Sequence, residues 1–513
     1  MRRGHEAPSG PDDAASEAVI EEKSTGLRRR LGLTGLAATG ICSMLGAGIN
    51  VVPFMIQRNV PGIGPHVLSA FALAAVPALL AAAAYAILAS AMPRAGGSYV
   101  YASRGLQPYV GFVASFSQWF GLSIAIGVVA YVTVPFLRDV ASALGAVEIA
   151  ATLEHGPVRV GLALLLLWGS VFINVRGAQL YERVLIPMML LMFILGAIVI
   201  VGGFAFSHDD FHRALAVREN VSTLPADTQF SWPVFLAAAA VLFSSFIGFD
   251  SIAQAGGEAK NPGTTLPLAI GIAIGVVGGY YLLFTAAVYH AVPWEFIAER
   301  AQTQDLTAPG LLGYLLPSHW TALIVFGAAV ALANDLPAML LAVSRLMFAW
   351  AEDGVFPSAV ARIHPRYFTP HVALAASGTM ATLSVFGCHF AGDFFLGVDM
   401  LVTSMLFNFL VMCLAVLTLP KRNPELAQRV TVFRRREVQI LLAGSGASAL
   451  AGLFVVQIWK DLSAPGVGWY FRSTPVWLIV MAIASMIFAF QWSRLARTDG
   501  DPQRIFQSLP PES

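Results

Sequence analysis

Apolar stretches long enough to cross a membrane recur from one end of this 513-residue chain to the other. A helix that crosses the hydrocarbon core needs about 20 mostly apolar residues. Reading between the charged residues gives twelve candidate spans, at 31–57, 66–92, 106–137, 160–175, 184–207, 230–256, 264–292, 315–347, 371–391, 400–419, 438–459 and 473–493. Only 12% of the residues are charged, about half the share of an average soluble domain. The sequence therefore predicts an all-α polytopic membrane protein with 12 transmembrane helices.

The balance of charge and the positions of the cysteines exclude other classes. Thirty-one basic against 30 acidic residues leave a net charge of +1, which argues against a nucleic-acid partner. Cys42, Cys388 and Cys413 lie inside apolar stretches, so we expect them to be buried and to form no disulfide. We expect no cofactor, metal site or enzyme activity, because no nucleophile–base set, metal cluster or phosphate-binding loop is visible.

The positions of Lys and Arg predict which side of the membrane each loop faces. If twelve helices cross and both termini are cytoplasmic, 23 of the 31 Lys and Arg lie on the cytoplasmic side and 8 on the other. Cytoplasmic loops of membrane proteins carry such an excess. We therefore expect a multi-pass protein of the plasma (inner) membrane with both termini in the cytoplasm.

Two polar tails flank the apolar region, at 1–30 and 496–513. The first ends in Arg28-Arg29-Arg30 at the predicted membrane edge. A basic residue near anionic lipid contributes about 1 kcal/mol of attraction. We interpret this run as an anchor that fixes the topology; the alternative is a site that senses membrane lipid.

Small residues interrupt two of the predicted spans. In the first span, Gly46-Ala47-Gly48 stands at mid-membrane depth, with Pro53 after it. In the sixth span, the stretch 244–251 (SSFIGFDS) is the counterpart. Irregular backbone at that depth is tolerated only where it lines a cavity or is buried in protein. Paired interruptions in two halves of a chain therefore predict a binding site near the midplane of a transporter.

The interruptions also indicate what such a site binds. The N-terminal end of a half-helix presents N–H groups and partial positive charge, which favour a carboxylate. The C-terminal end presents carbonyl groups, which favour an ammonium group or a small cation. A break that offers both ends matches a zwitterion, which is the form of an α-amino acid.

Several motifs together resemble the amino acid–polyamine–organocation family of permeases, of the amino acid permease type. They are the first interruption with Pro53, the loop 93–101 (PRAGGSYVY), the sixth-span stretch, 258–267 (EAKNPGTTLP), 342–345 (AVSR), 352–357 (EDGVFP) and 364–366 (HPR). The resemblance implies a five-plus-five inverted-repeat fold of the leucine-transporter type. The first repeat is then expected at 31–207 and the second at 230–419, with two further helices at 438–493.

The resemblance also implies the substrate contacts, residue by residue. They are Ser43, Gly46, Ala47 and Gly48 in the first interruption, and Ser245, Phe246, Ile247, Gly248 and Asp250 in the second. Related antiporters carry a gating aromatic residue at the position of Ser244, so Phe243 or Phe246 is the candidate gate in this chain. The implied activity is secondary transport of amino acids by alternating access.

Two acidic residues within the spans, Asp250 and Asp335, are candidates for coupling transport to protons. Burial favours the neutral form of a carboxyl, so either residue could carry a proton. Asp250 could instead bind a substrate ammonium or cap the second half-helix, and Asp335, beside Pro337, could instead be hydrated at the interface. Some relatives carry a lysine in the fifth span, where this chain has Met189. The coupling partner therefore stays open among H⁺, Na⁺ and an exchanged amino acid.

Two other functions also stay open. Acids at both ends of a cavity would favour a polyamine or organic-amine carrier, and a transporter-like nutrient sensor would share the fold. The expected partners are a small-molecule substrate and membrane lipid, and an oligomer is compatible with the sequence. The substrate's identity does not follow from the sequence, because backbone groups bind the part that all amino acids share.

Overall fold

The computed structural model describes residues 26–219, 229–391, 395–464, 468–499 and 501–510. Within these ranges the chain is helical and contains no strand, only two isolated bridges. Ten helices are long and apolar enough to cross a membrane: α5 (Val67–Ala91), α7 (Pro108–Ala143), α9 (Gly156–Val175), α10 (Ala178–Ala205), α14 (Pro262–Ala291), α17 (Ser318–Glu352), α18 (His371–Ala391), α19 (Phe395–Arg422), α21 (Arg436–Ser463) and α22 (Ser473–Asp499). They overlap ten of the twelve predicted spans, so the all-helical class is confirmed for the described residues.

The other two predicted spans, 31–57 and 230–256, are broken into shorter helices. The first consists of α2 (Leu33–Met44), α3 (Ala47–Asn50) and α4 (Val52–Asn59). The second consists of α12 (Trp232–Leu242), the 3₁₀ turn η2 (Phe243–Phe246) and α13 (Asp250–Gln254). Both breaks fall within the glycine-containing stretches, where the backbone can leave helical geometry at low cost.

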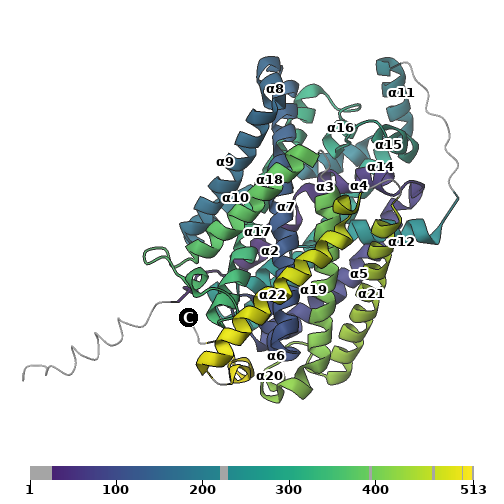
Figure 1. The fold of residues 1–513 in the computed structure, drawn as a ribbon. Coiled ribbons are helices and arrows are strands. Elements are labelled where there is room, and N and C mark those ends of the chain that lie inside the picture. The colour runs from purple at the N-terminus through teal and green to yellow at the C-terminus, as the bar shows by residue number, and fades with distance from the viewer. Residues whose placement is uncertain (1–25, 220–228, 392–394, 465–467, 500, 511–513) are drawn as a thin grey trace, which may run out of the picture.

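Short helices lie at the two ends of the bundle (Figure 1). We call one the terminal end, because the first and last described segments both lie there, beside α6 (Gly97–Gly105), α20 (Pro424–Gln428) and η6 (Pro502–Gln507). The opposite end carries α8 (Val147–Glu154), α11 (His208–Glu219), α15 (Trp294–Ala301) and α16 (Ala308–Leu312).

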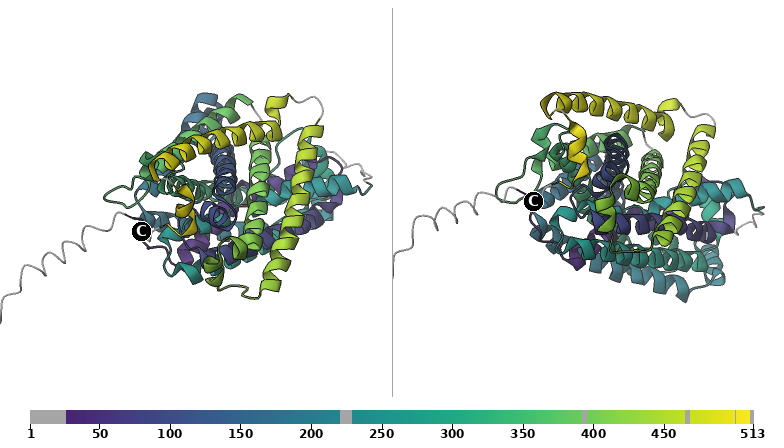
Figure 2. Two further views of the ribbon diagram at one scale, coloured as in Figure 1. Left: turned by 60° about the horizontal axis from the view of Figure 1, so that its bottom comes forward. Right: turned by 90° about the horizontal axis from the view of Figure 1, so that it is seen from below.

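Two long helices, α7 and α17, form the centre of the bundle. Of their most apolar 18-residue windows, 78% and 83% are buried, against 28% for α9, α10 and α21. Figure 2 shows α21 and α22 at the periphery, outside the helices that surround α7. The peripheral helices remain apolar although they are exposed, as expected of surfaces that face lipid.

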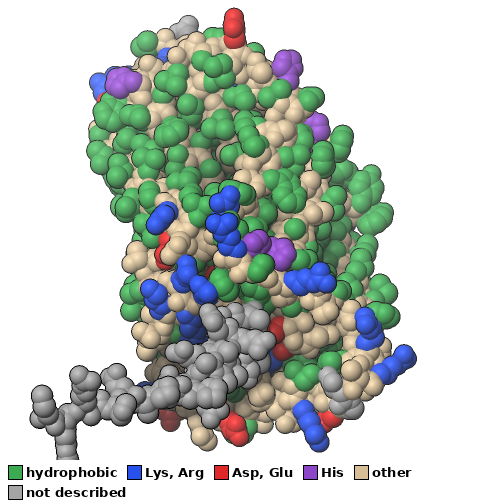
Figure 3. All heavy atoms as spheres, turned by 90° about the vertical axis from the view of Figure 1, so that its left-hand side faces the viewer, with side chains coloured by type: hydrophobic (Ala, Val, Ile, Leu, Met, Phe, Trp, Pro, Cys, Tyr) green, Lys and Arg blue, Asp and Glu red, His purple; other side chains and the backbone are tan. Residues whose placement is uncertain are grey.

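The molecular surface also shows an apolar region where the peripheral helices are exposed. Figure 3 shows a broad band of hydrophobic side chains over one face, with Lys and Arg side chains gathered toward the terminal end. Exposed hydrophobic residues include Leu165 of α9 and Ile194 of α10. A continuous apolar band of this kind belongs in a bilayer, because in water it would promote association.

Candidate functional site

A cavity of about 70 Å³ lies where the two broken segments meet the central helices. The broken segments contribute Ser43, Gly48 and Ile247 to its wall, and α17 contributes Asp335. Side chains of α7 and α19 form an apolar wall that includes Val128, Val129, Val398 and Leu401. The structure therefore brings both predicted interruptions to one small, mostly apolar chamber.

The two interruptions touch each other directly. The hydroxyl groups of Ser43 and Ser251 are 2.9 Å apart and share a hydrogen bond. Gly248 has a φ of 138°, and a Cβ on it would overlap the carbonyl of Ser43. Only glycine allows both this backbone angle and this close approach. Gly248 therefore forms the contact between the breaks and is not itself part of the cavity wall.

Gly48 lies beside the side chain that completes the broken end of α2. Tyr281 of α14 donates a hydrogen bond of 2.8 Å from its hydroxyl to the carbonyl of Met44, the last residue of α2. A Cβ on Gly48 would overlap that hydroxyl. The glycine thus leaves room for Tyr281 to satisfy a carbonyl that has lost its helical partner.

Asp335 supplies a carboxylate to the cavity. Its side chain is buried, and its Oδ1 has no hydrogen-bond partner among the described residues. A Cβ on Gly46 would overlap Oδ2, so the carboxylate lies directly against the first interruption. Nearby, the amide of Asn334 donates to Cys42 Sγ at 3.1 Å and to the Leu185 carbonyl at 3.2 Å, which ties this part of α17 to α2 and α10.

Asp250 has a different environment from Asp335. It is fully buried and is the first residue of α13, but it does not line the cavity. Its Oδ1 accepts a 3.1 Å hydrogen bond from the Gly248 N–H, and its Oδ2 accepts one from the Gln118 side chain. Asp250 thus satisfies one backbone N–H of the break, that of Gly248, which lies just before α13.

Gln118 connects Asp250 to a buried polar network nearer the terminal end. Asn408 donates to Gln118 Oε1 at 3.2 Å and to the Tyr85 hydroxyl at 2.8 Å. Tyr85 shares a 2.7 Å hydrogen bond with Ser98, which also accepts from Gln254 at 2.6 Å. The network joins α5, α6, α7, α13 and α19. The sequence analysis did not single out Gln118, Gln254 or Asn408, although an isolated amide in an apolar run was the available signal.

The remaining predicted residues lie around the cavity. Ser245 is buried next to Gly48, whose Cβ would lie 3.6 Å from its Cα. Phe246 packs on Phe71 and Tyr281, at ring-centroid distances of 5.2 and 6.2 Å, and Phe243 packs on Phe409 at 6.0 Å. Neither candidate gate ring is part of the cavity wall. Ala47 is in α3, and its side chain is outside the described part of the structure.

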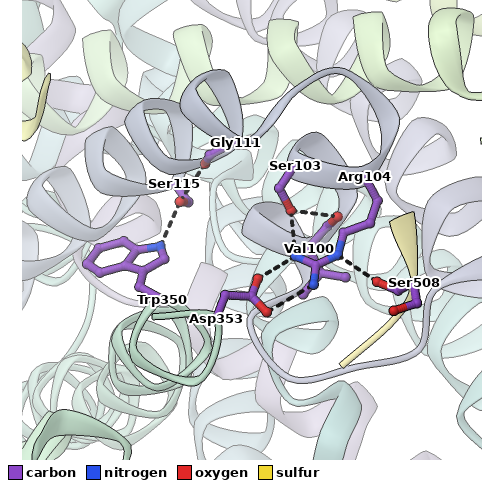
Figure 4. Close-up of polar contacts among 8 residues, drawn as sticks. All are labelled: Val100, Ser103, Arg104, Gly111, Ser115, Trp350, Asp353 and Ser508. Atoms are coloured by element: carbon purple, nitrogen blue, oxygen red, sulfur yellow. Dashed lines mark hydrogen bonds and ion pairs between the residues drawn. The ribbon is translucent and has the colours of Figure 1, made fainter. Parts of the chain in front are cut away.

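Two buried ion pairs close the terminal end below this network. Arg345 of α17 donates to Glu258 at 2.5 Å. Nearer the end, Arg104 of α6 donates to both oxygens of Asp353, at 2.5 and 3.0 Å, and its Nε donates to the Ser508 carbonyl at 3.2 Å (Figure 4). In the same view, the Trp350 indole donates to Ser115 of α7. Together these contacts join the ends of α6, α7 and α17 to the last described segment.

The described residues contain no group of three or more His, Cys, Asp or Glu placed to hold a metal ion. The chemistry of the chamber is therefore that of its backbone groups, its two serines and the Asp335 carboxylate.

Comparison with known proteins gives a consistent family. The family model described as amino acid permease matches residues 31–495. The chain is 28% identical to the mouse (Mus musculus) cationic amino acid transporter 4 over 71% of its own length and 56% of that protein's. It is 26% identical to a branched-chain amino acid permease of Bacillus subtilis and 25% identical to a methylthioribose transporter of the same organism. Those two alignments cover 93% of this chain and 95% and 96% of the two bacterial proteins.

Proposed function

This chain belongs to the amino acid permease family of the amino acid–polyamine–organocation superfamily, and from that membership we propose that it carries an α-amino acid across the plasma membrane by alternating access. The observation that supports this function best is the cavity between the two broken segments, with Asp335 in its wall. The family resemblance that the motifs predicted is confirmed by the match over residues 31–495.

The cavity offers complementary groups to the two charges of an amino acid. Gly48 lines the cavity in the first turn of the new helix that follows the break, so its N–H lacks an intrahelical acceptor and suits the substrate carboxylate. The unpartnered Oδ1 of Asp335 suits the ammonium group. Val128, Val129 and Leu401 would then surround an apolar side chain.

A second candidate is a carrier of organic amines, which the same Asp335 carboxylate would favour. The similar proteins are named as a cationic amino acid transporter, a branched-chain amino acid permease and a methylthioribose transporter. Membership in the family alone therefore does not identify the substrate. The apolar wall opposite Asp335 favours an amino acid with an aliphatic side chain over a dication, because a second cation would meet no acceptor there.

We propose twelve crossings, in which the two broken segments complete the ten continuous helices, and a five-plus-five inverted repeat. Helix packing supports the repeat. When each helix of one half is replaced by its counterpart in the other half, pairs of helices in contact correspond to other pairs in contact. The pair α2–α14 corresponds to α12–α5, α10–α17 to α19–α7, and α9–α17 to α18–α7. Helices α21 and α22 stand outside this exchange.

We further propose that the terminal end faces the cytoplasm of the cell. The support is the gathering of Lys and Arg at that end (Figure 3) together with the excess of basic residues that cytoplasmic loops carry. In this orientation the two ion pairs and the Gln118 network close the cytoplasmic path from the cavity.

For coupling, we propose that Asp335 carries the proton when transport is driven by a pH gradient. Asp335 is the candidate because it faces the cavity, whereas both oxygens of Asp250 are engaged at the helix break. Exchange of one amino acid for another is the alternative. Met189 of α10 stands where some relatives carry a lysine, so no positive side chain occupies that position to replace a sodium ion.

Purified protein, tested with separate amino acids, polyamines and simple amines, provides the direct test. A ligand present at 100 times its Kd stabilises a protein by about 2.7 kcal/mol, which a thermal-shift measurement resolves. We expect stabilisation by one or more aliphatic amino acids, and uptake of the same compounds by proteoliposomes. Stabilisation by diamines with none by any amino acid would reject the proposal in favour of the amine carrier.

A further inference from the structure

A second cavity, of about 210 Å³, lies at the terminal end and differs in character from the first. Glu258 and three segments that are distant in sequence form it: the stretch before α2, the junction of α9 and α10, and the loop that joins α17 to α18. Each segment contributes arginine, and the set is Arg28, Arg30, Arg176 and Arg366. The proposed transport mechanism uses none of them.

Four arginines and one carboxylate, that of Glu258, line this cavity, so positive charge predominates in it. No ion pair joins any of its four arginines to a described carboxylate, whereas other arginines such as Arg104 and Arg345 do form such pairs. Glu258 also lines the cavity; its Oε1 accepts from Arg345, and its Oε2 has no hydrogen-bond partner among the described residues. The four arginines are exposed and line one cavity, so an anion bound there would be attracted by several positive charges at once.

Aromatic rings hold three of these guanidinium groups in place. The Arg28 Cζ is 3.5 Å from the ring centroid of Phe368, and Arg176 lies 4.6 Å from Phe172. Arg366 lies 5.6 Å from the ring of Tyr367. Stacking fixes the plane of a guanidinium and leaves the N–H groups at its edge available to an acceptor.

The loop between α17 and α18 is built to bring these rings to the cavity. Phe368 has a φ of 56°, a left-handed conformation that non-glycine residues adopt only when the surroundings hold them in it. The Phe368 N–H donates to the His364 carbonyl at 2.9 Å, and Thr369 Oγ1 donates to the Val175 carbonyl at 2.8 Å. These bonds tie the loop to the end of α9.

The N-terminus of α10 completes the cavity. Gly177, with a φ of 95°, precedes the helix, and a Cβ there would lie 3.1 Å from the Tyr367 carbonyl oxygen. Gly177 provides no side-chain cap, so the first N–H groups of this 28-residue helix rely on other acceptors. Ala178 and Gln179 of that first turn line the cavity, where partial positive charge adds to that of the arginines.

We propose that this cavity binds a phosphate group, carried by an anionic lipid headgroup or by a soluble phosphate. A phosphate monoester carries a charge of about −1.5 to −2 and three acceptor oxygens, which match several guanidinium forks better than a single carboxylate does. The band of hydrophobic side chains gives way to Lys and Arg toward this end of the molecule, which is where headgroups lie (Figure 3). A bound phosphate would link the segment before α2 to the start of α10 and to the loop that precedes α18.

The test uses the full-length protein in two arms. In the lipid arm, the protein is placed in nanodiscs of phosphatidylcholine with increasing fractions of phosphatidic acid, and its thermal stability is measured. In the soluble arm, protein in a neutral detergent is titrated with inorganic phosphate and with glycerol 3-phosphate. Stabilisation in the lipid arm alone assigns the headgroup, and stabilisation in the soluble arm alone assigns a free phosphate.

The double substitution Arg176→Gln/Arg366→Gln removes two of the four charges. Each lost arginine is expected to weaken binding about fivefold, so the double variant should bind about 25-fold more weakly. Arg422→Gln is the matched control, because Arg422 is exposed at the same end but outside the cavity. It should change the affinity less than about twofold.

Two results would overturn the proposal. One is the absence of stabilisation in both arms, and the other is a stabilisation that the double variant retains in full. If that variant does not fold, Arg176→Lys/Arg366→Lys keeps the charge and removes the planar fork. It should bind more weakly than the unmodified protein and more tightly than a variant with Gln at either position, and equal binding by all of them would overturn the proposal as well.

Discussion

Asp335 is buried in a wall whose neighbours are mostly apolar, and one of its oxygens has no described hydrogen-bond partner. A buried acceptor without a partner costs about 1–3 kcal/mol. Asp335 lies where both helix breaks meet, so a ligand cation or a proton that reaches it would supply the partner that this oxygen needs. Asp250, by contrast, has both oxygens engaged.

Asp335→Asn should separate these roles because it keeps the shape of the side chain and removes its charge. Loss of a charge-assisted hydrogen bond to the substrate ammonium is expected to weaken binding about 10- to 100-fold. Uptake driven by a pH gradient into proteoliposomes should also be lost. Asp209→Asn, on exposed α11, is the control. Unchanged proton-driven uptake in both Asp335→Asn and Asp250→Asn would reject proton coupling through either residue.

Gly48→Leu should abolish substrate binding while the protein still inserts and folds. A side chain at this position meets the Tyr281 hydroxyl and fills the approach to the first break. Gly444→Leu is a matched control, since a Cβ on Gly444 meets no atom within 4 Å. Normal substrate affinity in the Gly48 variant, measured by ligand-induced thermal shift, would contradict the assigned site.

At the scale of elements, each broken helix depends on a side chain from elsewhere to satisfy its free backbone groups. Tyr281 has this role at the end of α2, and Asp250, which Gln118 holds in place, satisfies the Gly248 N–H just before α13. The hydrocarbon core of a bilayer contains no water to hydrogen-bond these backbone groups, so the side chains that bond them decide whether the break is stable. The breaks are consequently supported by packing between α2, α13 and α14, and not by glycine alone.

Asp250→Ala should therefore destabilise the protein more than Asp250→Asn does. Alanine leaves the Gly248 N–H and the Gln118 amide without acceptors, which is worth about 1–3 kcal/mol for each buried group. Asparagine keeps an acceptor for Gly248. Thermal unfolding in detergent measures the difference, and equal stabilities for the two variants would argue against the capping role.

At the scale of the whole molecule, the Gln118 network and two buried ion pairs lie one after another between the cavity and the terminal end. Gln118 is seven residues along α7 from the cavity residue Ala125, about 10 Å at the rise of a helix. The Arg345–Glu258 and Arg104–Asp353 pairs follow nearer the end. Because these contacts join α6, α7, α13, α17 and α19, access from this end requires several helices to move together.

The Arg345–Glu258 pair gives a test of this closure. Arg345→Leu leaves Glu258 buried without its partner and should cost about 3–5 kcal/mol of stability. Arg345→Leu/Glu258→Leu should cost less than that single change, because no unpaired charge remains. The exposed Arg58–Asp305 pair is the control, and Arg58→Leu should cost no more than about 1 kcal/mol. If the cost of the double variant in stability equals the sum of the costs of Arg345→Leu and Glu258→Leu alone, the pair does not act as a unit.

Much of the fold followed from local pattern. The ten continuous helices fell within a few residues of predicted spans, and the breaks fell at the glycine-containing stretches around Gly46 and Gly248. Both features depend on short segments of chain, since the length of an apolar run and the presence of glycine are read without knowing the neighbours. The family also followed from motifs that are local in sequence.

The roles of individual side chains did not follow in the same way. Sequence pattern made both Asp250 and Asp335 candidates for proton coupling, whereas helix packing turned one to the Gly248 N–H and the other to the cavity. Phe246 was a candidate gate, but the approach of α5 and α14 placed its ring among Phe71 and Tyr281. Arg28, Arg176 and Arg366 come from distant segments, and only tertiary structure brings them to one cavity. Hydrophobic length is a local property, so the sequence by itself determined the helices and their breaks; a polar side chain's partner depends on how helices rotate and pack, so only the tertiary structure decided the chemistry.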